Sequence, residues 1–102
     1  MNFLKVIYGQ PVTNIRGLTE QFKISDRTAR TMVKELEQHR NRYGDLAVIS
    51  SDGLKRVNVL AFTDYFAHRK ELQEPNLAKQ LPDYDPAEVA RQLGFYGTDE
   101  GK

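Results

Sequence analysis

Residues 14–36 constrain the fold more than any other part of the sequence. They contain two short segments with apolar residues at helical spacing, separated by Lys23-Ile24. Asn14 or Thr13 can cap the first segment and Ser25 the second, because these side chains can accept hydrogen bonds from the unpaired N–H groups that begin a helix. The pattern predicts two helices joined by a tight turn, over about residues 15–22 and about residues 26–40, with Gly44 ending the second.

The second of these predicted helices has two contrasting sides. At about 100° per residue, four apolar residues fall on one side: Ala29, Met32, Val33 and Leu36. The opposite side is polar and mainly basic, with Arg27, Arg30, Thr31, Lys34 and Gln38. Arginine pairs with guanine edges or phosphates, and threonine contacts phosphates or a thymine methyl group. The helix is therefore suited to pack on a core and enter the major groove of DNA, although a helix with a merely solvated charged side has the same pattern.

Two β-prone runs, residues 46–51 and 54–60, follow and are joined by Asp52-Gly53. A two-residue type I′ turn needs positive φ at both central residues, and Asp-Gly adopts it readily, so this is a strong hairpin signal. The resulting register sets two pairs of apolar residues opposite each other, on one face that can cover the helices: Val48 with Val57, and Leu46 with Val59.

Lys55 and Arg56 come just past the predicted turn, near the tip of the hairpin. In isolation they are ordinary polar residues at an exposed end. A hairpin that directly follows two helices joined by a turn is, however, the arrangement of a winged helix-turn-helix, in which the hairpin is the wing. We therefore expect an α+β fold with a short strand, two helices, a hairpin wing, a third helix and a C-terminal helical tail.

The elements on either side of this unit follow from shorter signals. Residues 3–8 are apolar and β-branched enough for a short strand, although a helical start fits them too, and Gly9 and Pro11 should end the element. Residues 62–72 have aromatic residues at helical spacing and predict a third helix. Three of its residues are expected in the core: Phe62, Phe66 and Leu72.

Charge is distributed unevenly along the 102 residues, although the net charge is only +1. Residues 1–73 carry 12 Lys and Arg against 8 Asp and Glu, whereas residues 74–102 carry 3 against 6. We expect two parts, a mildly basic DNA-binding winged helix-turn-helix domain and an acidic tail. Asp85 followed by proline predicts a short helix around residues 86–94 of the tail, which would fold back on the domain or meet a partner subunit.

The sequence contains no constellation typical of an enzyme or a metal site. There is no cysteine, His39 and His68 lack the spacing of metal ligands, and no glycine-rich phosphate loop is present. No apolar run is long enough to span a bilayer, and the N-terminus lacks the pattern of a signal peptide. We expect a cytoplasmic protein that is not an enzyme and that needs neither a cofactor nor a metal.

Residues 12–72 resemble the small excisionases, or recombination directionality factors, of phages and conjugative transposons. The resemblance rests on LTEQFKISDRTARTMVKELE, on the hairpin VISSDGLKRVNVLAF and on the helix that follows. It implies that the second helix meets the major groove through Arg27, Thr28, Arg30, Thr31 and Lys34. It also implies that the wing contacts the adjacent minor groove or its phosphates through Lys55 and Arg56. Phage repressors and MerR-like regulators share the same pattern.

The resemblance implies a mechanism without catalysis. A sequence-specific double-stranded DNA-binding protein of a phage or mobile element would bend DNA so that an integrase assembles an excision complex, with several copies binding cooperatively. The tail is longer than in the smallest excisionases. Two alternatives stay open: a transcriptional repressor or activator with the same fold that dimerises through residues 85–95, and a protein-interaction module whose winged helix does not contact DNA.

Overall fold

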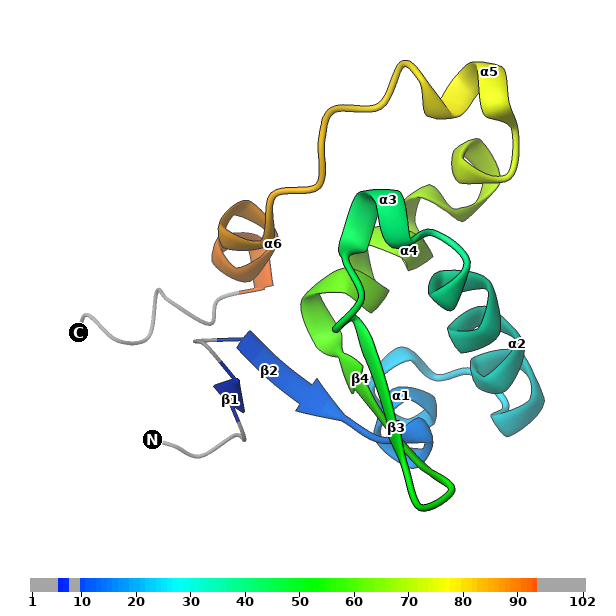
Figure 1. The fold of residues 1–102 in the computed structure, drawn as a ribbon, viewed down its shortest axis with the longest axis vertical. Helices are drawn as coiled ribbons and strands as arrows, with labels where there is room; N and C mark the ends of the chain where they lie inside the picture. The colour runs from blue at the N-terminus through cyan, green and yellow to red at the C-terminus, as the bar shows by residue number, and fades with distance from the viewer. Residues whose placement is uncertain (1–5, 8–9, 94–102) are drawn as a thin grey trace.

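The computed structural model describes residues 6–7 and 10–93 and shows several helices around a small antiparallel sheet (Figure 1). The strands are β1 Val6–Ile7, β2 Gln10–Thr13, β3 Val48–Ser51 and β4 Leu54–Asn58. The helices are α1 Ile15–Phe22, α2 Asp26–Glu37, α3 Arg40–Tyr43, α4 Val59–Leu72, α5 Pro75–Ala78 and α6 Pro86–Leu93. The predicted α+β class is therefore confirmed.

The turn between α1 and α2 forms as the cap residues predict. The side chain of Asn14 accepts a hydrogen bond from the Gly17 N–H at 2.8 Å, and that of Ser25 accepts one from the Thr28 N–H at 3.0 Å. Lys23 takes a left-handed backbone conformation (φ 57°), which ends α1 within one residue. The predicted bounds of α1 and the predicted start of α2 are thus confirmed.

The second helix is shorter than predicted. After a break at His39 (φ −105°, ψ 49°), the chain forms the separate helical turn α3. The break has a packing reason, because it turns Tyr43 inward, where its hydroxyl donates a hydrogen bond to the buried Asp64 at 2.6 Å. Gly44 (φ 87°) therefore ends α3, and not the single helix predicted from residue 26 onward.

The strands pair antiparallel in the order β1-β2-β4-β3. Of the strand predicted over residues 3–8, Val6 and Ile7 form β1, while its other residues and Gly9 lie outside the described part of the chain. Pro11 does not end the sheet, because it lies in β2 opposite Val6. Proline is tolerated near the start of a strand, where its missing N–H removes little pairing. β2 also pairs with β4, which brings the start of α1 beside the hairpin.

The β3–β4 hairpin has the predicted turn. Asp52 and Gly53 have φ of 52° and 78°, the positive values that a type I′ turn needs. Val48 lies opposite Val57, as predicted, and Val57 is fully buried. The preference of Asp52-Gly53 for this turn therefore fixes both the tip and the register of the hairpin.

The chain leaves the hairpin earlier than predicted. The side chain of Asn58 accepts hydrogen bonds from the N–H groups of Leu60 and Ala61, and this cap starts α4 at Val59 instead of at residue 62. Val59 is thus helical and buried, while Leu46 is 62% exposed. The predicted pairing of Leu46 with Val59 is wrong, because the cap ends the strand first.

Helix α4 supplies the centre of the core. Phe62 and Tyr65 are fully buried and Leu72 is nearly so. Phe66 is 42% exposed, with its ring 5.0 Å from that of Phe22 at the edge of α1. The core prediction is therefore confirmed for Phe62 and Leu72 and wrong for Phe66, which lies at the margin between α1 and α4.

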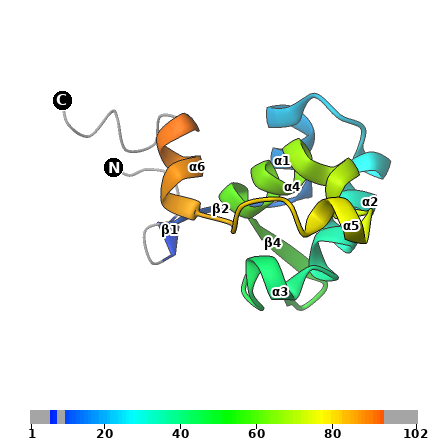
Figure 2. The same cartoon turned by 90° about the horizontal axis from the view of Figure 1, so that it is seen from above.

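The segment after α4 folds back onto the rest of the protein. Tyr84 packs edge-on against Tyr43, with ring centroids 4.9 Å apart, and Ala90 of α6 is 1% exposed. The side chain of Asp85 accepts backbone hydrogen bonds from the first turn of α6 and caps it. Helix α6 lies beside α4, on the opposite side from α2 (Figures 1 and 2). The described part of the tail therefore leaves the outer side of α2 uncovered.

Candidate nucleic-acid interface

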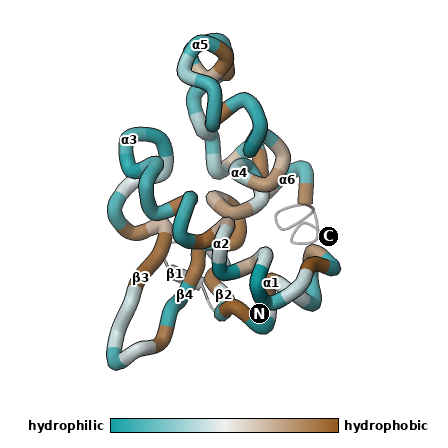
Figure 3. The backbone as a smooth tube through the Cα atoms, turned by 90° about the vertical axis from the view of Figure 1, so that its right-hand side faces the viewer, coloured by the Kyte–Doolittle hydropathy of each residue, from teal (hydrophilic) through white to brown (hydrophobic). Residues whose placement is uncertain are grey.

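Helix α2 and the β3–β4 hairpin lie on the same side of the molecule, and the hairpin projects beyond the body (Figures 1 and 3). The ammonium group of Lys55 in β4 donates a hydrogen bond to Glu37 in the last turn of α2 at 2.9 Å. Both side chains are roughly one-third exposed, at 39% and 32%. This ion pair ties the hairpin to the helix and so contributes to their relative position.

The two sides of α2 separate as the sequence predicts. Its inward side chains are all buried: Ala29, Met32, Val33 and Leu36. Arg27, Thr31 and Lys34 are exposed on the opposite side, and neither basic residue has an ion-pair partner among the described residues. These three side chains are therefore available to contact another molecule.

Two other predicted site residues of α2 have intramolecular contacts. The Nε of exposed Arg30 donates to Asp26 one helical turn earlier, at 2.7 Å. The hydroxyl of Thr28 accepts a hydrogen bond from Ser25 at 2.9 Å, so Thr28 belongs to the N-terminal cap. The structure thus brings Arg27, Arg30, Thr31 and Lys34 together along one exposed side and leaves Thr28 at its margin.

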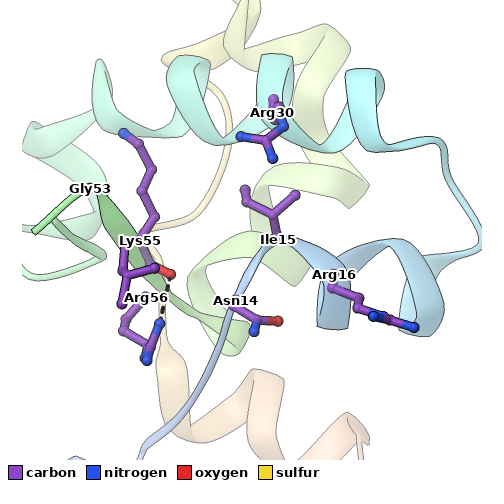
Figure 4. Close-up of a pocket in the computed structure, with 8 residues that line it drawn as sticks. Asn14, Ile15, Arg16, Arg30, Gly53, Lys55 and Arg56 are labelled. Carbon is purple, nitrogen blue, oxygen red and sulfur yellow. Dashed lines mark hydrogen bonds between the residues drawn. The ribbon is translucent and has the colours of Figure 1, made fainter. Parts of the chain in front are cut away.

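A pocket of about 240 Å³ opens between the start of α1, the middle of α2 and the hairpin (Figure 4). It is lined by Asn14, Ile15, Arg16, Arg30, Gly53, Leu54, Lys55 and Arg56. In Figure 4, Ile15 lies between Arg30 and Asn14, and Lys55 and Arg56 stand on the hairpin side. Four of the eight lining residues are basic and none is acidic, so the pocket suits an anion.

Three of the four basic side chains that line the pocket form ion pairs with carboxylates that do not line it. The pairs are Arg16 with Glu20 at 3.3 Å, Arg30 with Asp26 at 2.7 Å and Lys55 with Glu37 at 2.9 Å. Arg56 donates to the Lys55 carbonyl oxygen at 3.4 Å and has no ion-pair partner among the described residues. In both arginine pairs the carboxylate accepts from Nε, which orients the guanidinium and leaves its Nη groups for a further acceptor. Exposed pairs of this kind contribute only about 0–1 kcal/mol each, so an anion that enters the pocket can displace these carboxylates at small cost.

The inward side of α2 is fixed to α4 through Glu35. Its carboxylate accepts two hydrogen bonds from Arg69, both at 2.8 Å, and one from the Tyr65 hydroxyl at 2.7 Å. The hydrogen bonds from Arg69 hold the pKa of Glu35 below its ordinary value. Burial, followed by the hydrogen bond to Glu35, raises the pKa of Tyr65 to about 12. This network sets the direction in which the exposed side of α2 points.

Five residues of the pocket are absent from the set predicted from the sequence: Asn14, Ile15, Arg16, Gly53 and Leu54. Asn14 was predicted as a cap, and Arg16 carries a recognisable signal as an exposed arginine in the first turn of α1. Their proximity to the hairpin depends on the pairing of Thr13 in β2 with Val57 in β4, which no local pattern indicates. Leu54 reads in the sequence simply as an apolar strand residue.

Within the described ranges, no three His, Cys, Asp or Glu side chains come together as metal ligands do. Of the helices described, none is both long and apolar enough to cross a membrane. Comparison of the chain with protein-family profiles, with curated proteins and with solved structures gives no match. The site must therefore be interpreted from its own geometry and chemistry.

Proposed function

We propose that this protein is a winged helix-turn-helix protein that binds double-stranded DNA in a sequence-specific manner, without a catalytic step. In this proposal α1 and α2 form the helix-turn-helix and the β3–β4 hairpin is the wing. The observation that carries the proposal is the basic pocket, because it lies between the outer side of α2 and the hairpin. A phosphate held there would place the two elements on either side of one DNA strand.

The geometry of duplex DNA explains why α2 and the hairpin would lie on either side of one strand. The major and minor grooves are separated by a single sugar-phosphate backbone, so elements on either side of one strand enter different grooves. With α2 in the major groove, Arg27, Thr31 and Lys34 face base edges and flanking phosphates. The hairpin then reaches the adjacent minor groove, with Lys55 and Arg56 beside the shared strand.

The distribution of charge supports the same assignment. The exposed side of α2 and the pocket carry basic residues from three elements, three of them paired with carboxylates, while α6, capped by Asp85, lies across α4 from α2. A protein that neutralises several phosphates releases their counterions, so its affinity falls steeply as salt rises. We expect this behaviour here.

The test starts with selection of the full chain on a random duplex library, followed by fluorescence anisotropy on the selected 24-bp duplex. Lys34→Ala should weaken binding and lower the salt slope by about 1, because one phosphate contact is lost. Arg27→Ala should weaken binding by about tenfold and relax the sequence preference, as expected for a base contact.

Lys70→Ala is the matched control for Lys34→Ala. Both lysines are exposed in the last turn of a helix, but Lys70 lies on α4, outside the proposed interface. Failure of the library to yield a bound duplex, or equal effects of the two lysine variants, would contradict the proposed interface. Binding of a folded partner protein by the same side of α2, without DNA binding, would point to the interaction-module alternative.

For the biological role we propose an excisionase-like architectural factor that bends DNA for an integrase, on the strength of the sequence resemblance. Bending a 20–30 bp site costs on the order of 1–6 kcal/mol, which several cooperatively bound copies can share. Footprints should then show repeated sites beside an integrase attachment site, and energy transfer between duplex ends should rise on binding. A single palindromic site over a promoter, without bending, would instead indicate a transcriptional regulator.

A further inference from the structure

Leu54 stands out among the residues that line the basic pocket. It follows the Asp52-Gly53 turn, and it is 58% exposed. A single exposed leucine is ordinary on a protein surface. This one shares a pocket with four basic side chains, and more than half of its surface stays in contact with water in the isolated protein.

The alternation of β4 fixes which side chains accompany Leu54. Along the strand, Leu54 and Arg56 are exposed, whereas Val57 is buried and Lys55 is half-buried. Residues i and i+2 of a strand lie on the same face, about 6.6 Å apart along it. Leu54 and Arg56 therefore present one apolar and one cationic group side by side, at the wall of the pocket.

A DNA strand offers the complementary chemistry, because anionic phosphates alternate with deoxyribose rings whose carbon edges face the minor groove. We infer that Leu54 packs against the sugar edge of the minor groove while Arg30 and Arg56 hold the adjacent backbone phosphate. This inference rests on the proposed function and adds to it an apolar contact that positions the wing. Apolar side chains are known to pack or wedge into minor grooves, which widens the groove and bends the duplex.

The sequence supplies a matched control for this residue. Leu46 is also an exposed leucine, at 62%, and it lies just before β3, outside the pocket. Leu54→Ala and Leu46→Ala remove the same atoms from equally exposed positions. Both should leave the melting temperature nearly unchanged, because neither side chain is buried in the folded protein.

The experiment measures binding of both variants to the selected 24-bp duplex across a range of salt concentrations. Leu54→Ala should weaken binding by about fivefold with an unchanged salt slope, because an apolar contact releases no counterions. Leu46→Ala should change binding by less than about twofold, and Arg56→Ala should lower the salt slope by about 1. Hydroxyl-radical footprinting should show minor-groove sugars protected by the natural protein and exposed again with Leu54→Ala.

Equal binding by the two leucine variants, while Lys34→Ala still weakens binding, would overturn the role of Leu54 and leave the proposed function standing. Loss of self-association with unchanged DNA affinity in Leu54→Ala would also overturn it and assign Leu54 to a contact between copies. Absence of any duplex binding by the natural protein would overturn both the inference and the proposed function.

Discussion

Replacement of Asp64 by alanine should destabilise the protein more than any change on its surface. The carboxylate of Asp64 accepts hydrogen bonds from the Arg42 Nε at 2.9 Å and from the Tyr43 hydroxyl at 2.6 Å. The side chains of Arg42 and Asp64 are only 14% and 9% exposed. Asp64→Ala would therefore leave a guanidinium and a hydroxyl without their acceptor in a nearly water-free site.

The expected magnitude follows from these contacts. Breaking a buried ion pair by removing one partner costs about 3–5 kcal/mol, since the remaining charge is uncompensated. A small domain has a free energy of unfolding of only about 5–15 kcal/mol, so this loss is a large share of the total. Asp64→Asn keeps the volume and one acceptor oxygen but loses the charge, and we expect it to cost about 1.5–3 kcal/mol.

Urea unfolding followed by far-ultraviolet circular dichroism measures both variants. Glu20→Gln is the control, because it breaks the Arg16–Glu20 pair, whose side chains are 86% and 69% exposed, and it should cost less than about 1 kcal/mol. A loss below about 1 kcal/mol for Asp64→Ala would refute the reasoning. A full loss in Asp64→Ala with none in Asp64→Asn would show that volume, rather than charge, is responsible.

Three further predictions concern other side chains. Tyr84→Phe should raise the free energy of unfolding by about 1 kcal/mol, because the buried Tyr84 hydroxyl has no hydrogen-bond partner among the described residues; a loss in urea unfolding would contradict this. Glu37→Gln should strengthen duplex binding by about twofold to fivefold in anisotropy, since the pair adds only about 0–1 kcal/mol to the position of the hairpin while its carboxylate competes with phosphate for Lys55; weaker binding would show that positioning of the hairpin outweighs this competition. The pKa of Glu35 is lower in the folded protein than its ordinary value of 4.5. The ionised carboxylate therefore stabilises the fold above pH 4.5, and this stabilisation is lost as the pH falls through the folded pKa. The difference in stability between the natural protein and Glu35→Gln should therefore shrink below about pH 4.5, and a constant difference from pH 7 to pH 3 would contradict it.

The parts of the fold that local chemistry decides could be predicted from the sequence. Asn14 and Ser25 cap helices through hydrogen bonds a few residues away, and Asp52-Gly53 forms a turn whose conformation those two residues themselves favour. Asn58 carries the same kind of cap signal. The β-branched residues on both sides of it favour a strand, however, so the end of the hairpin could not be placed without the packing of α4.

Features that depend on distant partners could not be predicted. The break between α2 and α3 depends on the contact of Tyr43 with Asp64, which lies 21 positions further along the chain. The exposed side of α2 follows from helical periodicity, whereas the pocket does not. Arg16 and Arg56 are 40 positions apart, and they line one pocket because β2 runs through a proline that reads locally as a strand breaker.

The bidentate contact of Glu35 with Arg69 has a consequence for recognition. Helix α2 cannot roll about its axis without breaking two hydrogen bonds of 2.8 Å and the contact with Tyr65. Its orientation is therefore settled when the protein folds, which reduces the conformational entropy lost on binding. In the proposed complex, a rigid α2 cannot adjust to a groove of the wrong width, so the duplex would have to adapt to it. We accordingly expect the stiffness of base steps that the protein never touches to affect the affinity of a site.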